Sequence, residues 1–100
     1  MELRQLRYFV QIADAGSVRT ASTRVRIAQS ALSRQVTALE DELGVPLLVR
    51  HARGVTPTEA GARLRERAVS ILSQIEDIRA EIMAEGDAPA GTASIGTSAG

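Results

Sequence analysis

The fold is decided by residues 26–44, which read RIAQSALSRQVTALEDELG. Apolar side chains recur in this stretch at intervals of three or four residues, which is the spacing of one face of an α-helix. Gly44 is the residue type that most often follows a helix, and Pro46 cannot continue one. We therefore predict a helix over residues 29–43. Its apolar stripe consists of Leu32, Val36, Leu39 and Leu43.

Two shorter helices are predicted ahead of this one. Residues 3–15 carry apolar side chains at helical spacing, and Gly16 lies where this first helix would stop. Ser17 is a good N-cap residue for a second helix over about residues 18–24. Residues 25–27 then leave room only for a tight connection. The spacing resembles that of a helix-turn-helix.

A small β-hairpin is predicted after the third helix. Residues 47–50 and 55–56 are short β-type runs, and Gly54 lies in the turn between them. Three short helices and such a hairpin, or wing, form a winged helix-turn-helix. The expected fold is therefore mainly α.

A long helix is predicted to complete this layout. Thr56 would cap it, with Pro57 in the first helical position, and Thr58 is the alternative cap. The helix should run from Thr58 to about Glu85, a length of roughly 40 Å at ~1.5 Å per residue. Its apolar residues alternate at spacings of four and three, which is a heptad seam typical of a dimerisation helix. The seam consists of Leu64, Ala68, Ile71, Ile75, Ile78 and Ile82.

The composition excludes several classes of protein. There is no cysteine, so disulfides and thiolate metal sites are excluded, and the single histidine, His51, forms no metal cluster by itself. No apolar run approaches the roughly 20 residues that a membrane span needs, and the N-terminus lacks the apolar core of a signal peptide. We therefore expect a cytoplasmic chain with no metal, no cofactor and no membrane partner.

Charge is balanced overall but unevenly distributed. The chain has twelve basic and twelve acidic residues. Residues 1–58 contain eight arginines and five acidic residues, whereas residues 59–100 contain four arginines and seven acidic residues. Residues 15–39 contain four arginines and no acidic residue. This basic stretch includes the polar start of the third helix. A polar arc there, made of Gln29, Ser30, Ser33, Arg34 and Thr37, adjoins the apolar stripe.

The third helix is predicted to read double-stranded DNA. The major groove is about 12 Å wide and accepts one helix, whose first turns offer backbone N–H groups to phosphates and polar side chains to base edges. The acidic residues 40–42 near its other end would be repelled by phosphates, so the helix should enter the groove by its N-terminal end. Arg53, at the turn of the wing, is suited to contact a minor groove. Arg50, on the preceding strand, is a further candidate DNA-binding residue.

Catalysis and protein binding are the two alternatives to DNA binding. Ser33, His51 and Asp41 could be named as a catalytic triad, but a surface helix and a turn provide no pocket that excludes water, so the chain is not expected to be an enzyme. The acidic run near residue 40 is better interpreted as a solvated helix end. The alternative to DNA binding is a winged-helix module that binds a protein and never DNA.

The residues also resemble a known family. The segments MELRQLRYFVQIADAGSV, AQSALSRQVTALEDELGVPLL and TPTEAG are similar to the N-terminal DNA-binding region of LysR-type bacterial transcriptional regulators, over roughly residues 1–85. The resemblance implies a homodimer, with a tetramer left open for the intact protein, that binds an imperfect palindromic operator. It also implies a C-terminal effector-binding domain, which alone would meet a small-molecule effector. The domains would then be residues 1–57 for DNA, 58–85 for dimerisation, and 86–100 as a flexible linker leading into the missing domain.

The resemblance assigns roles to individual residues. Gln29, Ser33 and Arg34 match positions that meet bases and phosphates, and Arg53 matches the wing position near the minor groove. Ser17 and Thr20 match the start of the second helix, where phosphates are expected.

Two positions depart from the family pattern. Ala28 and Ser30 flank Gln29 where the family commonly has Ser and Pro, so the third helix loses a capping hydroxyl worth about 1 kcal/mol. Val49 stands where the family often has Phe, and this smaller core residue is expected to pack the wing less firmly.

Overall fold

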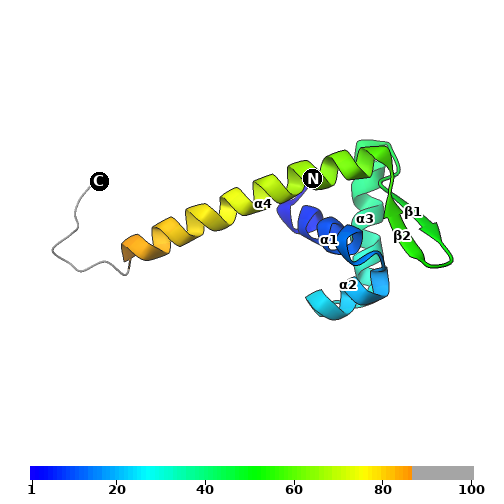
Figure 1. The fold of residues 1–100 in the computed structure, drawn as a ribbon, viewed down its shortest axis with the longest axis horizontal. Coiled ribbons are helices and arrows are strands. Elements are labelled where there is room, and N and C mark those ends of the chain that lie inside the picture. The colour runs from blue at the N-terminus through cyan, green and yellow to red at the C-terminus, as the bar shows by residue number, and fades with distance from the viewer. Residues whose placement is uncertain (87–100) are drawn as a thin grey trace.

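The computed structural model describes residues 1–86 (Figure 1). Three short helices and a hairpin cluster at the start of one long helix, which projects away from them as a rod. This is the predicted winged helix-turn-helix with an appended helix. The elements in chain order are α1 (Leu3–Ala15), α2 (Val18–Val25), α3 (Gln29–Leu43), β1 (Leu48–His51), β2 (Gly54–Pro57) and α4 (Glu59–Gly86).

The helix ends follow the local sequence as predicted. Gly16 ends α1 in the left-handed conformation, with φ of 70°, and its N–H donates to the carbonyl of Ile12. Ser17 caps α2 by accepting a hydrogen bond from the N–H of Thr20 at 3.1 Å. Gly44, with φ of 74°, ends α3. The predicted bounds of α1 and α3 are therefore confirmed, and α2 is one residue longer than expected.

The core lies between α1, α2, α3, the base of the wing and the first half of α4. Its largest fully buried side chains are Phe9, Ile12, Leu32, Leu39 and Leu47. The predicted stripe of α3 is confirmed for Leu32, Val36 and Leu39, but Leu43 is exposed. The last turn of α3 thus extends beyond the core that its first three turns cover.

The wing is an antiparallel pair in which Val49 faces Thr56 and Arg50 faces Val55. The expectation that Val49 is a core residue is wrong, because this side chain is 49% exposed whereas its neighbour Leu48 packs against the core. Successive side chains of a strand point to opposite faces, so only one of the two can point inward. Residue 49 therefore lies outside the core of this chain, and its smaller size leaves no gap there.

The wing is attached to the rest of the domain by close backbone contacts. The N–H of Val55 donates to the carbonyl of Gly16 at 3.0 Å. A Cβ atom on Gly54, where φ is 140°, would lie 2.1 Å from that same carbonyl oxygen. Only glycine allows this approach, which fixes the wing beside the turn between α1 and α2.

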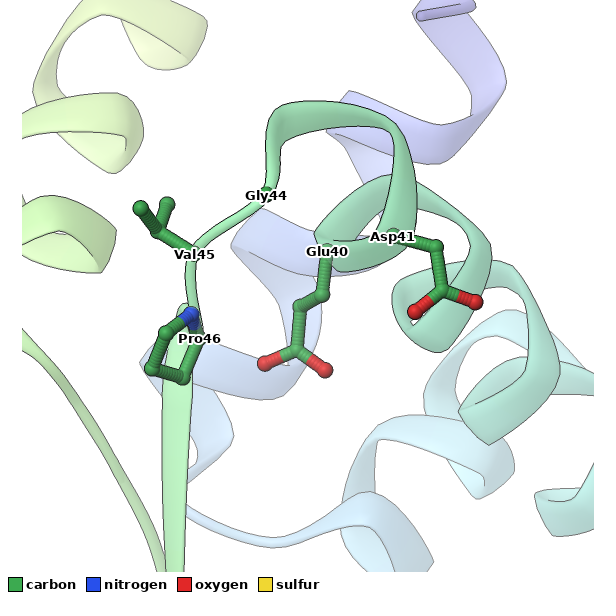
Figure 2. A pocket seen from close by; sticks show the side chains of 5 residues that line it. All are labelled: Glu40, Asp41, Gly44, Val45 and Pro46. Atoms are coloured by element: carbon green, nitrogen blue, oxygen red, sulfur yellow. The ribbon is translucent and has the colours of Figure 1, made fainter.

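The carboxylate of Glu40 also holds the base of the wing. It accepts hydrogen bonds from the N–H groups of Leu47, at 2.7 Å, and Leu48, at 3.2 Å. Figure 2 shows the Glu40 side chain reaching from α3 toward the chain that leads into β1. The interpretation of the whole acidic run as a solvated helix end is therefore wrong for Glu40, which joins α3 to β1.

The cap of the long helix lies two residues after the first predicted cap. Thr56 and Pro57 belong to β2, and the alternative, Thr58, is the cap, because its hydroxyl accepts from the N–H of Gly61 at 3.0 Å. The same hydroxyl donates to the carbonyl of Pro46 at 2.8 Å. The start of α4 is thereby fixed against the segment that precedes the wing.

Only the first half of α4 packs on the domain. Ala68 is fully buried, and Leu64 and Leu72 pack against the core cluster. Arg65 forms an ion pair with Asp14 of α1, and the hydrogen bond and charge of that carboxylate raise the pKa of the Arg65 guanidinium. Every residue in 76–86 is exposed.

Candidate nucleic-acid interface

The N-terminal turns of α3 form an open surface. Gln29, Ser30, Arg34 and Thr37 are exposed, and Ser33 is half-buried beside them. The chain enters α3 through a tight turn in which Arg26 adopts the left-handed conformation, with φ of 60°. The polar arc expected from the sequence is therefore present, and no element within residues 1–86 covers it.

The backbone at this helix start is free to bind an anion. The N-cap residue Ala28 makes no side-chain cap hydrogen bond, as its sequence predicted, and the first turn holds no acidic residue. The first N–H groups of a helix have no partner inside it, and they carry the positive end of the helix dipole. Phosphate oxygens are a natural partner for such groups.

The wing contributes two arginines. The Arg50 guanidinium donates a hydrogen bond from Nη2 to the Ser33 hydroxyl of α3 at 3.2 Å. Arg53 is exposed in the turn between the strands. Both residues were predicted as candidates, but the contact between Arg50 and Ser33 was not, because residues 17 positions apart give no local sequence signal.

The two candidates on α2 lie at its first turn. The Ser17 hydroxyl is engaged as the helix cap, and Thr20 is exposed. Thr20 can therefore meet a phosphate with its side chain, whereas Ser17 contributes mainly by fixing where α2 starts.

Acidic side chains gather at the opposite end of α3. Glu42 forms an ion pair with the amino group of Met1 at 2.7 Å, and Glu40 binds the wing backbone. A shallow hollow beside them is lined by Glu40, Asp41, Gly44, Val45 and Pro46 (Figure 2). The helix is thus polarised, with arginine and uncapped N–H groups at one end and carboxylates at the other.

Residues 1–86 contain neither a metal-binding cluster nor a helix that could span a membrane. The structure contains no group of three or more metal-ligating side chains in this range. None of the helices described combines the length and the apolar character that crossing a membrane requires.

The fold and this surface define a winged helix-turn-helix with an exposed recognition helix. Residues 3–62 match the family model described as bacterial regulatory helix-turn-helix protein, lysR family. The chain belongs to this family, as the resemblance of its motifs indicated. Its members are regulatory proteins, in agreement with the prediction that the chain is not an enzyme.

Curated relatives share much of the sequence. The nitrogen assimilation regulatory protein nac of Escherichia coli is 47% identical over 100 residues, which is all of this chain and 33% of that protein. The transcriptional regulator BsdA of Bacillus subtilis is 41% identical over 98 residues, 97% of this chain and 34% of that protein. The chain thus spans about a third of the length of these relatives.

Solved structures share the fold. The DNA-binding domain of BenM, in complex with catB site 1 DNA, superposes with a TM-score of 0.84 and 37% identity over 89% of this chain and 100% of that chain. The DNA complex of the CbnR DNA-binding domain gives a TM-score of 0.79 and 40% identity over 86% of this chain and 99% of that chain. The structure of CbnR, a LysR family transcriptional regulator, gives a TM-score of 0.80 and 40% identity over 85% of this chain and 29% of that chain.

Proposed function

We propose that the chain binds double-stranded DNA in a sequence-specific manner and regulates bacterial transcription, as a homodimer on an imperfect palindrome. The observation that carries the proposal is the open, uncapped N-terminal end of α3, which presents Gln29, Ser30 and Arg34 beside the wing. The BenM and CbnR domains, crystallised with DNA, support it through their similarity.

The residues divide into base readers and phosphate binders. Gln29, Ser33 and Arg34 lie on the face of α3 that would enter the major groove, where Arg pairs with guanine through two hydrogen bonds. Ser30, Thr37 and Thr20 flank this face and would contact phosphates. Arg53, on the wing, would reach the minor groove, whose negative potential attracts arginine.

Two copies would pair through α4. The side chains of Ile71, Ile78 and Ile82 are 44%, 58% and 62% exposed, which is unusual for isoleucines that share one helix face. Leu64 and Ala68, by contrast, pack on the chain's own core. We therefore place the dimer seam at Ile71, Ile75, Ile78 and Ile82, a shorter stretch than the sequence suggested, with residues 1–57 as the DNA-binding unit and 58–85 as the dimerisation helix. A tetramer is left open for the intact protein.

The proposal extends to the rest of the protein and its place in the cell. A small-molecule effector would act through a C-terminal part outside this chain, consistent with the greater length of the relatives. The prediction of a linker over residues 86–100 lies, apart from Gly86, outside the described residues. We place the regulator in the cytoplasm, where a bacterial operator lies.

DNA binding is tested by selecting duplexes from a random-sequence pool with the wild-type chain. We expect a palindromic motif with half-sites about one helical turn apart, and binding that weakens steeply as salt rises. Arg34→Ala should lower affinity by about 1–3 kcal/mol and relax specificity at one position per half-site if Arg34 reads a base. Arg79→Ala is the matched control, because it removes the same charge from the far half of α4. If the wild-type chain binds no duplex even at low salt, the alternative function, a protein-interaction module, would be favoured.

The dimer is tested by Ile78→Asp, with Ser73→Asp as the control on the outward side of the same helix. Burying one isoleucine contributes about 1.5–3 kcal/mol, and a symmetric dimer loses two copies, so the dissociation constant should rise more than about a hundredfold. Sedimentation equilibrium measures it. Identical dissociation constants for the two variants would remove the seam from the proposal.

A further inference from the structure

One hydrogen bond joins the wing to α3 inside the proposed DNA surface. Arg50 lies on β1 and Ser33 on the second turn of α3, and the guanidinium Nη2 lies 3.2 Å from the hydroxyl oxygen. Arg50 is exposed, whereas Ser33 is half-buried. The hydroxyl therefore faces the surface with a cation beside it.

This bond constrains what the Ser33 hydroxyl can do. A serine hydroxyl has one proton to donate and two lone pairs that accept, whereas arginine can only donate. The contact with Arg50 therefore occupies a lone pair of Ser33 and leaves the proton unused.

Hydroxyl groups on the neighbouring helix are used in another way. Ser22 and Thr23 of α2 donate their protons to the carbonyl of Arg19, at 2.7 and 3.2 Å, which is a common arrangement for hydroxyls inside helices. Within residues 1–86 the structure records no such acceptor for Ser33. Its proton is available to a molecule outside the chain.

We propose that Arg50 is a positioning residue that commits Ser33 to act as a hydrogen-bond donor toward DNA. The cation also polarises the hydroxyl, which strengthens the bond that the hydroxyl donates. The pair then selects acceptor atoms: N7 of a purine, O6 of guanine, O4 of thymine or a phosphate oxygen. It disfavours the amino groups of cytosine and adenine, which present donors. This inference rests on the proposed function and specifies the chemistry of one contact within it.

The first test is a double-mutant cycle on the 100-residue chain, with a duplex recovered by the selection described above. Ser33→Ala should raise the dissociation constant about 3- to 10-fold, the effect of one net hydrogen bond. In the Arg50→Ala background the same change should cost about twofold or less, because the hydroxyl is then free to reorient. The control cycle pairs Ser33→Ala with Arg53→Ala and should be additive. Additivity in both cycles overturns the inference.

A rescue experiment separates positioning from charge alone. Arg50→Lys keeps a group that can only donate, whereas Arg50→Gln introduces an amide that both donates and accepts. We expect the dependence on Ser33 to persist in the lysine variant and to fall in the glutamine variant. Equal dependence in both would show that the donor-only character of residue 50 is irrelevant.

The acceptor is identified with modified duplexes. One series replaces single bases by analogues that lack N7, O6 or O4, and another replaces single phosphates by methylphosphonates. One substitution should weaken binding of the wild-type chain about 3- to 10-fold and leave binding of Ser33→Ala unchanged. A hit in the first series assigns a base acceptor, and a hit in the second assigns a phosphate. If no substitution distinguishes wild type from Ser33→Ala, Ser33 donates to neither and the inference is wrong.

The outcomes also separate this inference from the proposed function. A wild-type chain that retains a palindromic duplex but gives additive cycles supports DNA regulation and refutes only the role of Arg50. A wild-type chain that retains no duplex refutes both. Thermal unfolding of each variant detects a folding defect. Little change in stability is expected for substitutions at the exposed residues Arg50 and Arg53, and Ser33→Ala, at a half-buried position, is compared with wild type directly.

Discussion

Gly61 gives the sharpest test of how α4 is held to the domain. A Cβ atom on this residue would lie 2.0 Å from the carbonyl oxygen of Leu47 and 2.9 Å from its carbonyl carbon. That carbonyl also accepts a hydrogen bond from the N–H of Thr58 at 3.0 Å. Gly61→Ala therefore cannot be accommodated by a flexible side chain, because backbone must move.

The net effect is set by opposing terms. Alanine is favoured over glycine inside a helix by about 1 kcal/mol. Overpacking costs about 1–3 kcal/mol, and weakening the bond between Thr58 and Leu47 adds about 1 kcal/mol. We expect the free energy of unfolding to fall by about 1–3 kcal/mol, which for a domain of this size lowers Tm by roughly 5–20 °C.

Gly86→Ala is the matched control. It makes the same substitution in the same helix, where nothing lies within 4 Å of the added Cβ atom. Unfolding by urea, followed by circular dichroism, measures both variants, and Gly86→Ala should change the free energy of unfolding by less than about 0.5 kcal/mol. If Gly61→Ala is as stable as Gly86→Ala, α4 does not approach the wing as closely as described.

Two further substitutions test the ends of α3. Ala28→Ser should raise the free energy of unfolding by about 0.5–2 kcal/mol, because the serine hydroxyl supplies the absent cap. The control Ala38→Ser, at an exposed mid-helix position, should lower it slightly. Thermal melts that rank the two variants the other way would contradict the cap assignment. Glu40→Gln should lower the free energy of unfolding by about 1–3 kcal/mol, because two N–H groups lose an ionised acceptor. The control Asp41→Asn, in the same turn but exposed, should leave the free energy of unfolding unchanged. Equal urea midpoints for the two variants would show that Glu40 is dispensable for the wing.

Much of this fold could be predicted because local sequence patterns determine it. The spacing of Leu32, Val36 and Leu39, and the stop and cap residues Gly16 and Ser17, each act within a few positions of the chain. They fixed the bounds of α1 and α3 in advance. The start of α4 does not follow from local sequence alone, because Thr56 and Thr58 both suit a cap and only the pairing of Thr56 with Val49 excludes the first.

What could not be predicted depends on residues far apart in the chain. In the sequence Glu40 is one of three consecutive acidic residues, and only the folded chain distinguishes it, because the N–H groups of Leu47 and Leu48 donate to its carboxylate. The contact between Arg50 and Ser33 requires the wing to fold back on α3. The inward face of β1 was misjudged for the same reason, because a run of apolar residues at 47–49 does not tell which of them points inward. Such choices are made by tertiary packing, not by local pattern.

The exposed half of α4 links the helical order of this segment to the concentration of the protein. Residues 76–86 are all exposed, and an isolated helix shorter than about 12–15 residues is marginal in water without support from packing. In the dimer proposed above, a second copy would support these turns, so amide protons of this segment should exchange more slowly as protein concentration rises. Dimerisation and completion of α4 would then be one coupled equilibrium, in which protein concentration sets the fraction of chains whose long helix is formed to its end.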